Sequence, residues 1–333
     1  ADRDITAVFA AQDRYYTVRY WYDAAELELA QEFRIIAHGS CTFTAAEPEK
    51  AGAVWMGWDA LTADVVSDLN IHPVFVEPRL PETVVDKFDY LYSTDPADDS
   101  AYTAEEFFGI LWAGRAREYF RLGDRIRITV PKNDSFADLE FVLELRSFKH
   151  FESAEREGEF AGPYFGMVGV MNAKQSLKVV YENTGGYPAM TMPDFLNDVV
   201  LPNLPRFFRA MMERIRVHSS AGGTSAQIVT VDAYLTIESQ AELGQNATEV
   251  PYRDEIAAGA DEVTFGCYTG LASRIKRAYN GNGEASSYWL RSPYHSDGKM
   301  FCYVEKDGNM KMTYPATTVG VSWGFCLRAN GGA

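Results

Sequence analysis

The last part of the chain, residues 288–327, alternates short apolar segments with tight-turn signals, and this pattern constrains the fold most. The segment YWLRSP, Tyr288–Pro293, predicts an apolar strand that ends at Ser-Pro. The pairs Asp297-Gly298 and Asp307-Gly308 are typical of hairpin turns, because glycine accepts the positive φ that such turns require. The residues on either side of Asp307-Gly308 form the hairpin arms, and GVSWGFCL, residues 320–327, closes the sheet. Small antiparallel sheets are therefore predicted.

Two amphipathic helices are predicted upstream of these strands. Thr103-x-x-Glu106 is a capping box, and apolar residues recur behind it at helical spacing until Leu122-Gly123. Pro193-Asp194 is expected to open a short helix, and Asn203 is a suitable N-cap for the longer second helix. The apolar face of that helix consists of Leu204, Phe207, Phe208, Met211, Met212 and Ile215. Two helices combined with small antiparallel sheets predict the α+β fold class.

Residues 1–80 form a separate β-rich segment. The expected strands are Tyr16–Tyr22, Leu29–Ile36, Cys41–Thr44 after a turn at residues 38–40, an aromatic segment Trp55–Trp58, and Ile71–Val76. The order of strand, turn, Pro, Trp-x-Gly-Trp and a final strand resembles the internalin-type B-repeat, a small β-grasp-like module of extracellular bacterial proteins. The resemblance implies a spacer domain.

Residues 81–102 are predicted to be a linker between two domains. The segment contains Pro81, Pro96 and the acidic residues Asp95, Asp98 and Asp99. Proline and repelling like charges favour extended, solvated chain.

The region 103–330 resembles a C-type-lectin-fold domain. The resemblance depends on WLRSP, the closing Gly320-Val321-x-x-x-Phe325, and the upstream Glu118-Tyr119-Phe120 and Gly186-Tyr187-Pro188. More narrowly, the region is similar to a bacterial family of unknown function and to variable proteins of diversity-generating retroelements, which include phage receptor-binding tips. The resemblance implies an extracellular module on a phage tail or bacterial surface. Its hypervariable surface would recognise a cell-surface protein or glycan.

The candidate contact residues lie on loops and hairpins between the predicted strands. Segment 294–303 mixes Tyr, Ser, Asp and Gly, the composition that antibody paratopes use for contact area and adaptable hydrogen bonds. Where related chains carry Pro and a small residue, this chain has Trp323-Gly324: an exposed Trp323 would contact the ligand, and a buried one would repack the sheet. Trp289, Leu290 and Arg291 are expected to be scaffold. The predicted ligand-contact residues are Tyr294, His295, Ser296, Asp297, Phe301, Tyr303, Lys311, Tyr314 and Trp323.

Charge and composition exclude several function classes. The chain has 31 Lys and Arg against 47 Asp and Glu, a formal charge of −16, which argues against a nucleic-acid partner. No apolar run is long enough to span a bilayer, so membrane insertion is not expected. The oligomeric state is left open.

No catalytic constellation is evident in the sequence. The 5 histidines are not at metal-ligand spacing, and no nucleophile or nucleotide-binding motif occurs, so no enzyme activity, cofactor or metal is predicted. Two alternatives stay open. One is an oxidase of the formylglycine-generating kind, with Cys302 and Cys326 as neighbours on adjacent strands. The other is a purely structural surface or virion component.

Overall fold

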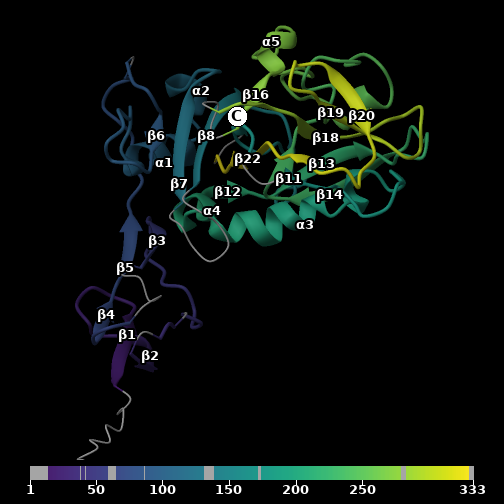
Figure 1. The fold of residues 1–333 in the computed structure, drawn as a ribbon. Helices are drawn as coiled ribbons and strands as arrows, with labels where there is room; N and C mark the ends of the chain where they lie inside the picture. The colour runs from purple at the N-terminus through teal and green to yellow at the C-terminus, as the bar shows by residue number, and fades with distance from the viewer. Residues whose placement is uncertain are drawn as a thin grey trace, which may run out of the picture. The chain divides into compact units, whose positions relative to one another are not determined.

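A computed structural model describes residues 14–37, 39–41, 43–58, 65–85, 87–130, 139–171, 174–278 and 283–329 (Figure 1). The chain divides into two compact units, which are unit 1, Ala1–Glu77, and unit 2, Pro78–Ala333. Strands predominate over short helices, which confirms the α+β class.

Unit 1 is built around strand β1 (Tyr15–Trp21). It pairs antiparallel with β2 (Leu29–Ile36) and parallel with β4 (Leu69–Ile71). A second, two-stranded sheet joins β3 (Val54–Trp58) to β5 (Pro73–Val76). The expected strand over residues 71–76 is thus divided between two sheets.

The core of unit 1 follows from the two-residue period of β1. Val18 and Tyr20 lie on the same face of the strand and are buried with Val65 and Ile71. The Tyr20 ring centroid is 4.9 Å from that of Trp58 in an edge-to-face arrangement. Two sequence-based predictions for unit 1 are not confirmed. The expected strand at residues 41–44 is not formed by its described residues, and residue 38 of the predicted turn lies outside the described residues.

Unit 2 contains a seven-stranded sheet that joins distant parts of the chain. Its strand order is β12-β22-β10-β8-β7-β6, and β15 also pairs with β22. The strands are β6 (Tyr92–Ser93), β7 (Arg125–Val130), β8 (Leu139–Ser147), β10 (Tyr164–Met167), β12 (Met212–Glu213), β15 (Thr236–Ile237) and β22 (Trp323–Leu327). Because β22 lies between β10 and β12, the last strand of the chain closes the core of the unit.

A five-stranded sheet, order β11-β21-β18-β19-β20, carries the C-terminal hairpins (Figure 1). Its strands are β11 (Lys174–Gln175), β18 (Tyr288–Pro293), β19 (Phe301–Val304), β20 (Met310–Thr313) and β21 (Val319–Gly320). The hairpin predicted at Asp307-Gly308 is confirmed, since β19 and β20 pair antiparallel and Gly308 has φ +84°. The smaller sheets contain β9 (Glu152–Ser153), β13 (Ile215–Ser220) and β14 (Ile228–Ala233), and β16 (Lys276–Arg277) and β17 (Ala285–Ser286).

The helices of unit 2 are short. They are α1 (Ala104–Trp112), α2 (Ala116–Tyr119), η1 (Tyr187–Ala189), α3 (Met192–Asp194), the π-helix η2 (Phe195–Val200), η3 (Leu201–Asn203), α4 (Arg206–Met211), η4 (Tyr252–Glu255) and α5 (Leu271–Arg274). The capping box at the start of α1 is confirmed, because the Glu106 N–H donates to Thr103 Oγ1 at 3.3 Å and the Thr103 N–H donates to Glu106 Oε2 at 3.1 Å. Gly114, at φ +67°, separates α1 from α2, so the expected continuous helix is interrupted.

The second helix differs from its prediction at both ends. The chain is already helical at Met192, Asn203 ends η3, and Pro205 precedes α4, so Asn203 is not the N-cap. Helix α4 ends at Met211 because Met212 pairs with Leu327 in the large sheet. The apolar stripe of the sequence therefore spans a helix and a strand.

The predicted linker at residues 81–102 is wrong in its second half. Leu91 is fully buried, Tyr92 begins β6 and pairs with Ile126, and the Tyr92 and Phe107 rings stack with centroids 5.5 Å apart. The acidic side chains that suggested solvated chain have local roles: Asp98 accepts from Ser93 at 2.5 Å and from Arg127 at 2.6 Å. The described part of the chain contains no helix long and apolar enough to cross a membrane.

Candidate functional site

A buried ion pair holds the WLRSP strand in place. The Arg291 guanidinium is fully buried and donates to both Glu242 carboxylate oxygens, at 2.7 and 2.6 Å. His150 Nε2 lies 2.7 Å from Glu242 Oε1. Burial would raise the pKa of Glu242, but the charge of Arg291 and the hydrogen bond with His150 outweigh it and lower that pKa to about 2. Trp289, Leu290 and Arg291 are all fully buried, as expected for scaffold residues.

A second buried network surrounds Glu238. Its carboxylate accepts from Arg146 at 2.5 Å, Tyr268 at 2.8 Å and Lys276 at 2.8 Å. Burial lowers the pKa of Lys276 to about 8, although the nearby Glu238 charge opposes the shift. These charges are enclosed and engaged with one another, so they stabilise the arrangement of strands and do not face a ligand.

Two of the predicted contact residues are core residues, and their assignment to the ligand surface is wrong. Trp323 is fully buried in β22, where its ring lies 5.0 Å from that of Phe141 and its Nε1 donates to Met171 Sδ at 3.1 Å. Phe301 is also fully buried at the start of β19. All five residues of β22 are buried, so both faces of this strand are covered, and Phe301 and Cys302 are both buried in β19. A binding role would require exposure.

Four further predicted residues, Tyr294 to Asp297, lie on a loop that the rest of the unit holds firmly. Asn183 Nδ2 donates to the carbonyl oxygens of Tyr294, Asp297 and Met300, at 3.2, 2.9 and 2.7 Å. The His295 N–H donates to the Tyr252 hydroxyl at 3.0 Å. The loop is therefore held in place by the rest of the unit, and Ser296 is the exposed one of the four predicted residues.

The remaining three predicted residues lie on or next to the β19–β20 hairpin. Tyr303 pairs directly with Lys311, so their side chains share one face of the sheet. The Tyr303 ring centroid is 6.2 Å from that of buried Trp289. Tyr314 follows β20 and is 40% exposed. The structure thus brings Tyr303, Lys311 and Tyr314 together on one hairpin.

Segment 177–182 adds exposed apolar residues that sequence reasoning missed. The Leu177 and Lys178 N–H groups both donate to the Pro315 carbonyl, at 2.8 and 3.1 Å, which ties this segment to the end of the hairpin. The Tyr181 and Tyr314 rings meet at 5.0 Å and 85°. We call the exposed residues of the two segments the aromatic patch: Val179, Val180, Tyr181, Met312 and Tyr314. The apolar run 179–181 is visible in the sequence, but nothing local distinguishes it from a core strand.

The β19–β20 hairpin and the segment after it also line a small cavity of about 160 Å³, which we call the hydroxyl pocket. Side-chain hydroxyls dominate its lining. The lining residues are Lys174, Ser286, Ser287, Tyr303, Lys306, Thr313, Thr317, Thr318, Val319 and Gly320. Gly320 is required at the base, because a Cβ there would lie 2.4 Å from Val170 Cγ1 and 2.6 Å from the Ser287 carbonyl oxygen. Of the predicted contact residues, Tyr303 alone lines this pocket.

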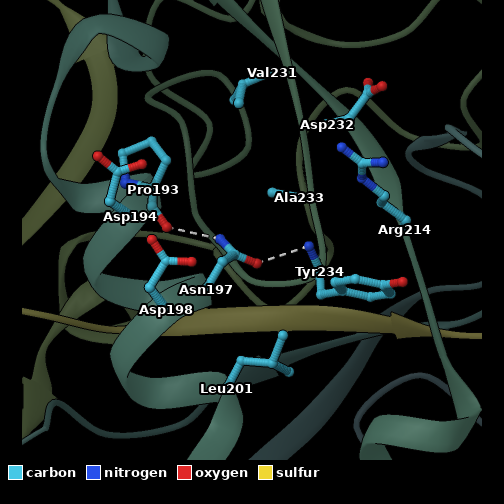
Figure 2. A pocket seen from close by; sticks show the side chains of 10 residues that line it. All are labelled: Pro193, Asp194, Asn197, Asp198, Leu201, Arg214, Val231, Asp232, Ala233 and Tyr234. Carbon is cyan, nitrogen blue, oxygen red and sulfur yellow. Dashed lines mark hydrogen bonds between the residues drawn. The ribbon is translucent and has the colours of Figure 1, made fainter.

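A second, larger cleft of about 350 Å³ lies between η2 and β14 (Figure 2). Asp194 and Asp198 line it on the helical side, and Asp232, Arg214 and Tyr234 line it on the other side. Asn197 joins the two sides: its Nδ2 donates to the Pro193 and Leu235 carbonyls, and its Oδ1 accepts from the N–H groups of Tyr234 and Leu235. The amide of Asn197 is thus engaged by backbone, and carboxylates dominate the charge of the cleft.

The described residues contain no group of three or more His, Cys, Asp or Glu side chains placed to hold a metal ion. Cys302 and Cys326 are free thiols, in the five-stranded and the seven-stranded sheet respectively, so they are not neighbours on adjacent strands. Burial raises the pKa of both thiols, which keeps them protonated and weakly nucleophilic. The thiol pair of the oxidase alternative is therefore not assembled.

One family comparison bears on this region. Residues 170–329 match a family described as Domain of unknown function (DUF6273). The matched range covers the whole five-stranded sheet, the aromatic patch, the hydroxyl pocket and the second cleft. No curated protein and no solved structure matches the chain significantly.

Proposed function

We propose that unit 2 is a recognition module with a C-type-lectin-like fold that binds a cell-surface glycan without chemical turnover. The observation that carries this proposal is the hydroxyl pocket, to which the β19–β20 hairpin contributes Tyr303 and Thr313. The exposed ring of Tyr314, which contacts Tyr181, follows the same hairpin in the chain. Serine and threonine hydroxyls both donate and accept hydrogen bonds, as sugar hydroxyls do. Tyrosine rings supply an apolar face and a polar edge.

The size and rigidity of the pocket support this proposal. Drug-sized ligands occupy roughly 300–1,000 Å³, whereas a cavity of about 160 Å³ suits one small ring. Its walls come from β11, β17, β19, β20, β21 and the segments next to them, and buried Trp289 supports the Tyr303 ring. Preorganised walls reduce the entropy lost on binding.

The wider setting of the module is also a proposal. The C-terminal strand pattern supports a relationship to the variable proteins of diversity-generating retroelements, in which a fixed scaffold presents changeable contact residues. We propose display on a phage tail or bacterial surface, with unit 1 as a B-repeat-like spacer.

Binding to intact bacterial cells tests the glycan proposal. Fluorescently labelled protein is expected to bind cells of a susceptible strain. Periodate oxidation of surface sugars should abolish binding, and protease treatment should leave it unchanged. Tyr303→Ala and Thr317→Val should each weaken binding roughly tenfold, since each removes a ring or a hydrogen bond from the site. Lys299→Gln, on the exposed hairpin turn, is the matched control and should have no effect.

The aromatic patch favours one competing outcome, a protein partner, because Val179 and Tyr181 are 83% and 64% exposed. Binding that survives periodate but is lost after protease treatment, and that requires Tyr181 and Tyr314 rather than Thr317, would overturn the glycan proposal. Absence of binding to every strain would point to the structural alternative.

A further inference from the structure

We infer that the hydroxyl pocket takes an acidic sugar, a monosaccharide unit that carries a carboxylate, rather than a neutral one. This inference rests on the proposed glycan-binding function and adds the charge of the ligand. It starts from two lysines, Lys174 on β11 and Lys306 in the turn after β19, which both line the pocket.

These lysines lie on or next to strands that are not neighbours in the five-stranded sheet. Strand β11 is the first strand of the sheet, and Lys306 follows β19, the fourth. Among the described residues, neither ammonium group has a hydrogen-bond or ion-pair partner. In a chain with a formal charge of −16, two lysines that line one small cavity and have no ion-pair partner in the described part of the chain favour a negatively charged ligand there.

The acidic residues next to Lys306 are already engaged. Glu305 forms an ion pair with Lys311. The Asp307 carboxylate accepts from the Asn309 backbone and side chain, at 2.9 and 2.8 Å. Of these described residues, neither carboxylate forms an ion pair with Lys174 or Lys306, so both ammonium groups can pair with an anion.

The rest of the lining distinguishes a sugar acid from a simple anion. Three threonine hydroxyls, from Thr313, Thr317 and Thr318, and the Tyr303 ring lie with the lysines around one cavity. A carboxylate bound by lysine makes charge-assisted hydrogen bonds, which are stronger than neutral ones. The hydroxyls would then bind the ring oxygens and the tyrosine would cover one ring face.

The second cleft provides an internal contrast. It is larger, and the charged residues that line it are three aspartates and one arginine, namely Asp194, Asp198, Asp232 and Arg214. Repulsion by these carboxylates disfavours an acidic sugar there. Asp198→Asn is therefore a useful control at a different concave site of the unit.

Calorimetric titration of the full chain with matched saccharides tests the inference. Glucuronate and galacturonate are expected to bind at least tenfold more tightly than glucose, galactose and the uncharged methyl ester of glucuronic acid. Lys174→Gln and Lys306→Gln should each weaken uronate binding roughly tenfold and leave neutral-sugar binding unchanged. Raising the salt concentration should weaken only uronate binding. Lys299→Gln and Asp198→Asn should behave like the wild-type chain.

The possible results separate this inference from the proposed function. Equal affinity for glucuronate and its methyl ester would overturn the acidic-sugar inference and leave glycan binding intact. Acetate or inorganic phosphate binding as tightly as glucuronate would overturn it in favour of a general anion site. If no saccharide binds while the lysine variants and the wild type unfold identically, both proposals fail.

Discussion

At the residue scale, the molecule is defined by charges that are buried and paired. Arg291 and Glu242 form a two-bond ion pair inside unit 2, and burying either alone would cost several kcal/mol. Glu255 is different, because its carboxylate is buried but accepts from the uncharged Ser220 N–H, at 3.0 Å, and from the Ser292 hydroxyl. Burial raises its pKa to about 7, against the opposing charge of Arg291.

The raised pKa of Glu255 predicts a specific pH dependence. Between pH 4.5 and about 7 the folded state holds a proton that the unfolded state releases, so this group makes stability fall as pH rises through that window. Glu255→Gln mimics the protonated acid. We expect the variant to match the wild type near pH 4.5 and to exceed it by about 3 kcal/mol at pH 8. Urea unfolding at both pH values measures this; a constant difference between the two proteins would contradict it.

At the element scale, one segment connects the parts of the candidate site. Residues 177–183 run from the Pro315 turn, through the aromatic patch, to the loop that contains residues 294–300. Asn183 is fully buried there, and it also accepts from the Gly223 N–H at 2.7 Å. A single side chain therefore joins three separate loops.

Asn183→Ala should loosen the 294–300 loop. The substitution removes all four hydrogen bonds that the Asn183 side chain makes to the Tyr294, Asp297 and Met300 carbonyls and to the Gly223 N–H, so we expect a loss on the order of 3 kcal/mol in unfolding free energy. Hydrogen exchange should accelerate at residues 294–300. Asn309→Ala is the matched control. Asn309 is exposed, and its side-chain amide donates a hydrogen bond to Asp307 within the β19–β20 turn, away from the 294–300 loop. Its effect should stay within about 0.5 kcal/mol. Equal exchange rates in both variants would show that Asn183 does not hold the loop.

At the scale of the whole molecule, the chain forms two units with separate cores. Unit 1 buries Val18, Tyr20, Val65 and Ile71 around a three-stranded sheet. Unit 2 closes its large sheet with β22, the last strand of the chain. Each unit thus has the core that independent folding requires.

A protein of residues 78–333 should fold without unit 1. We expect its thermal midpoint to lie within about 2 °C of the corresponding transition of the full chain, because unit 2 keeps its own core. A protein of residues 78–320, which lacks β22, serves as the contrast and should not fold cooperatively. Calorimetry of the three proteins measures both expectations. A shorter protein that unfolds at a much lower temperature than the full chain would show that unit 1 stabilises unit 2.

Local signals predicted the local features well. The Thr103 capping box, the hairpin at Asp307-Gly308 and strand β2 all depend on neighbouring residues, and all are present. The linker prediction failed because it relied on Pro96 and the acidic residues. Leu91 and Tyr92 in the same segment pack against residues of β7 and α1, which are distant in the sequence. The helix expected to reach Ile215 ends at Met211, because the backbone of Met212 pairs with Leu327 of β22.

The sequence by itself determined the α+β class, the position of the Asp307-Gly308 turn and the buried character of the WLRSP strand, because turn chemistry and apolar periodicity act over a few residues. The tight hairpin turn expected at Asp297-Gly298 is wrong, because Gly298 does not have a positive φ and residues 294–300 form a longer loop between β18 and β19. Tertiary structure alone decided which rings are exposed. It turned Phe301 and Trp323 inward and left Tyr181 and Tyr314 at the surface. It also brought Lys174 and Lys306 to one cavity, across more than a hundred residues of chain. Exposure and long-range proximity depend on what packs against a segment, and no local pattern contains that information.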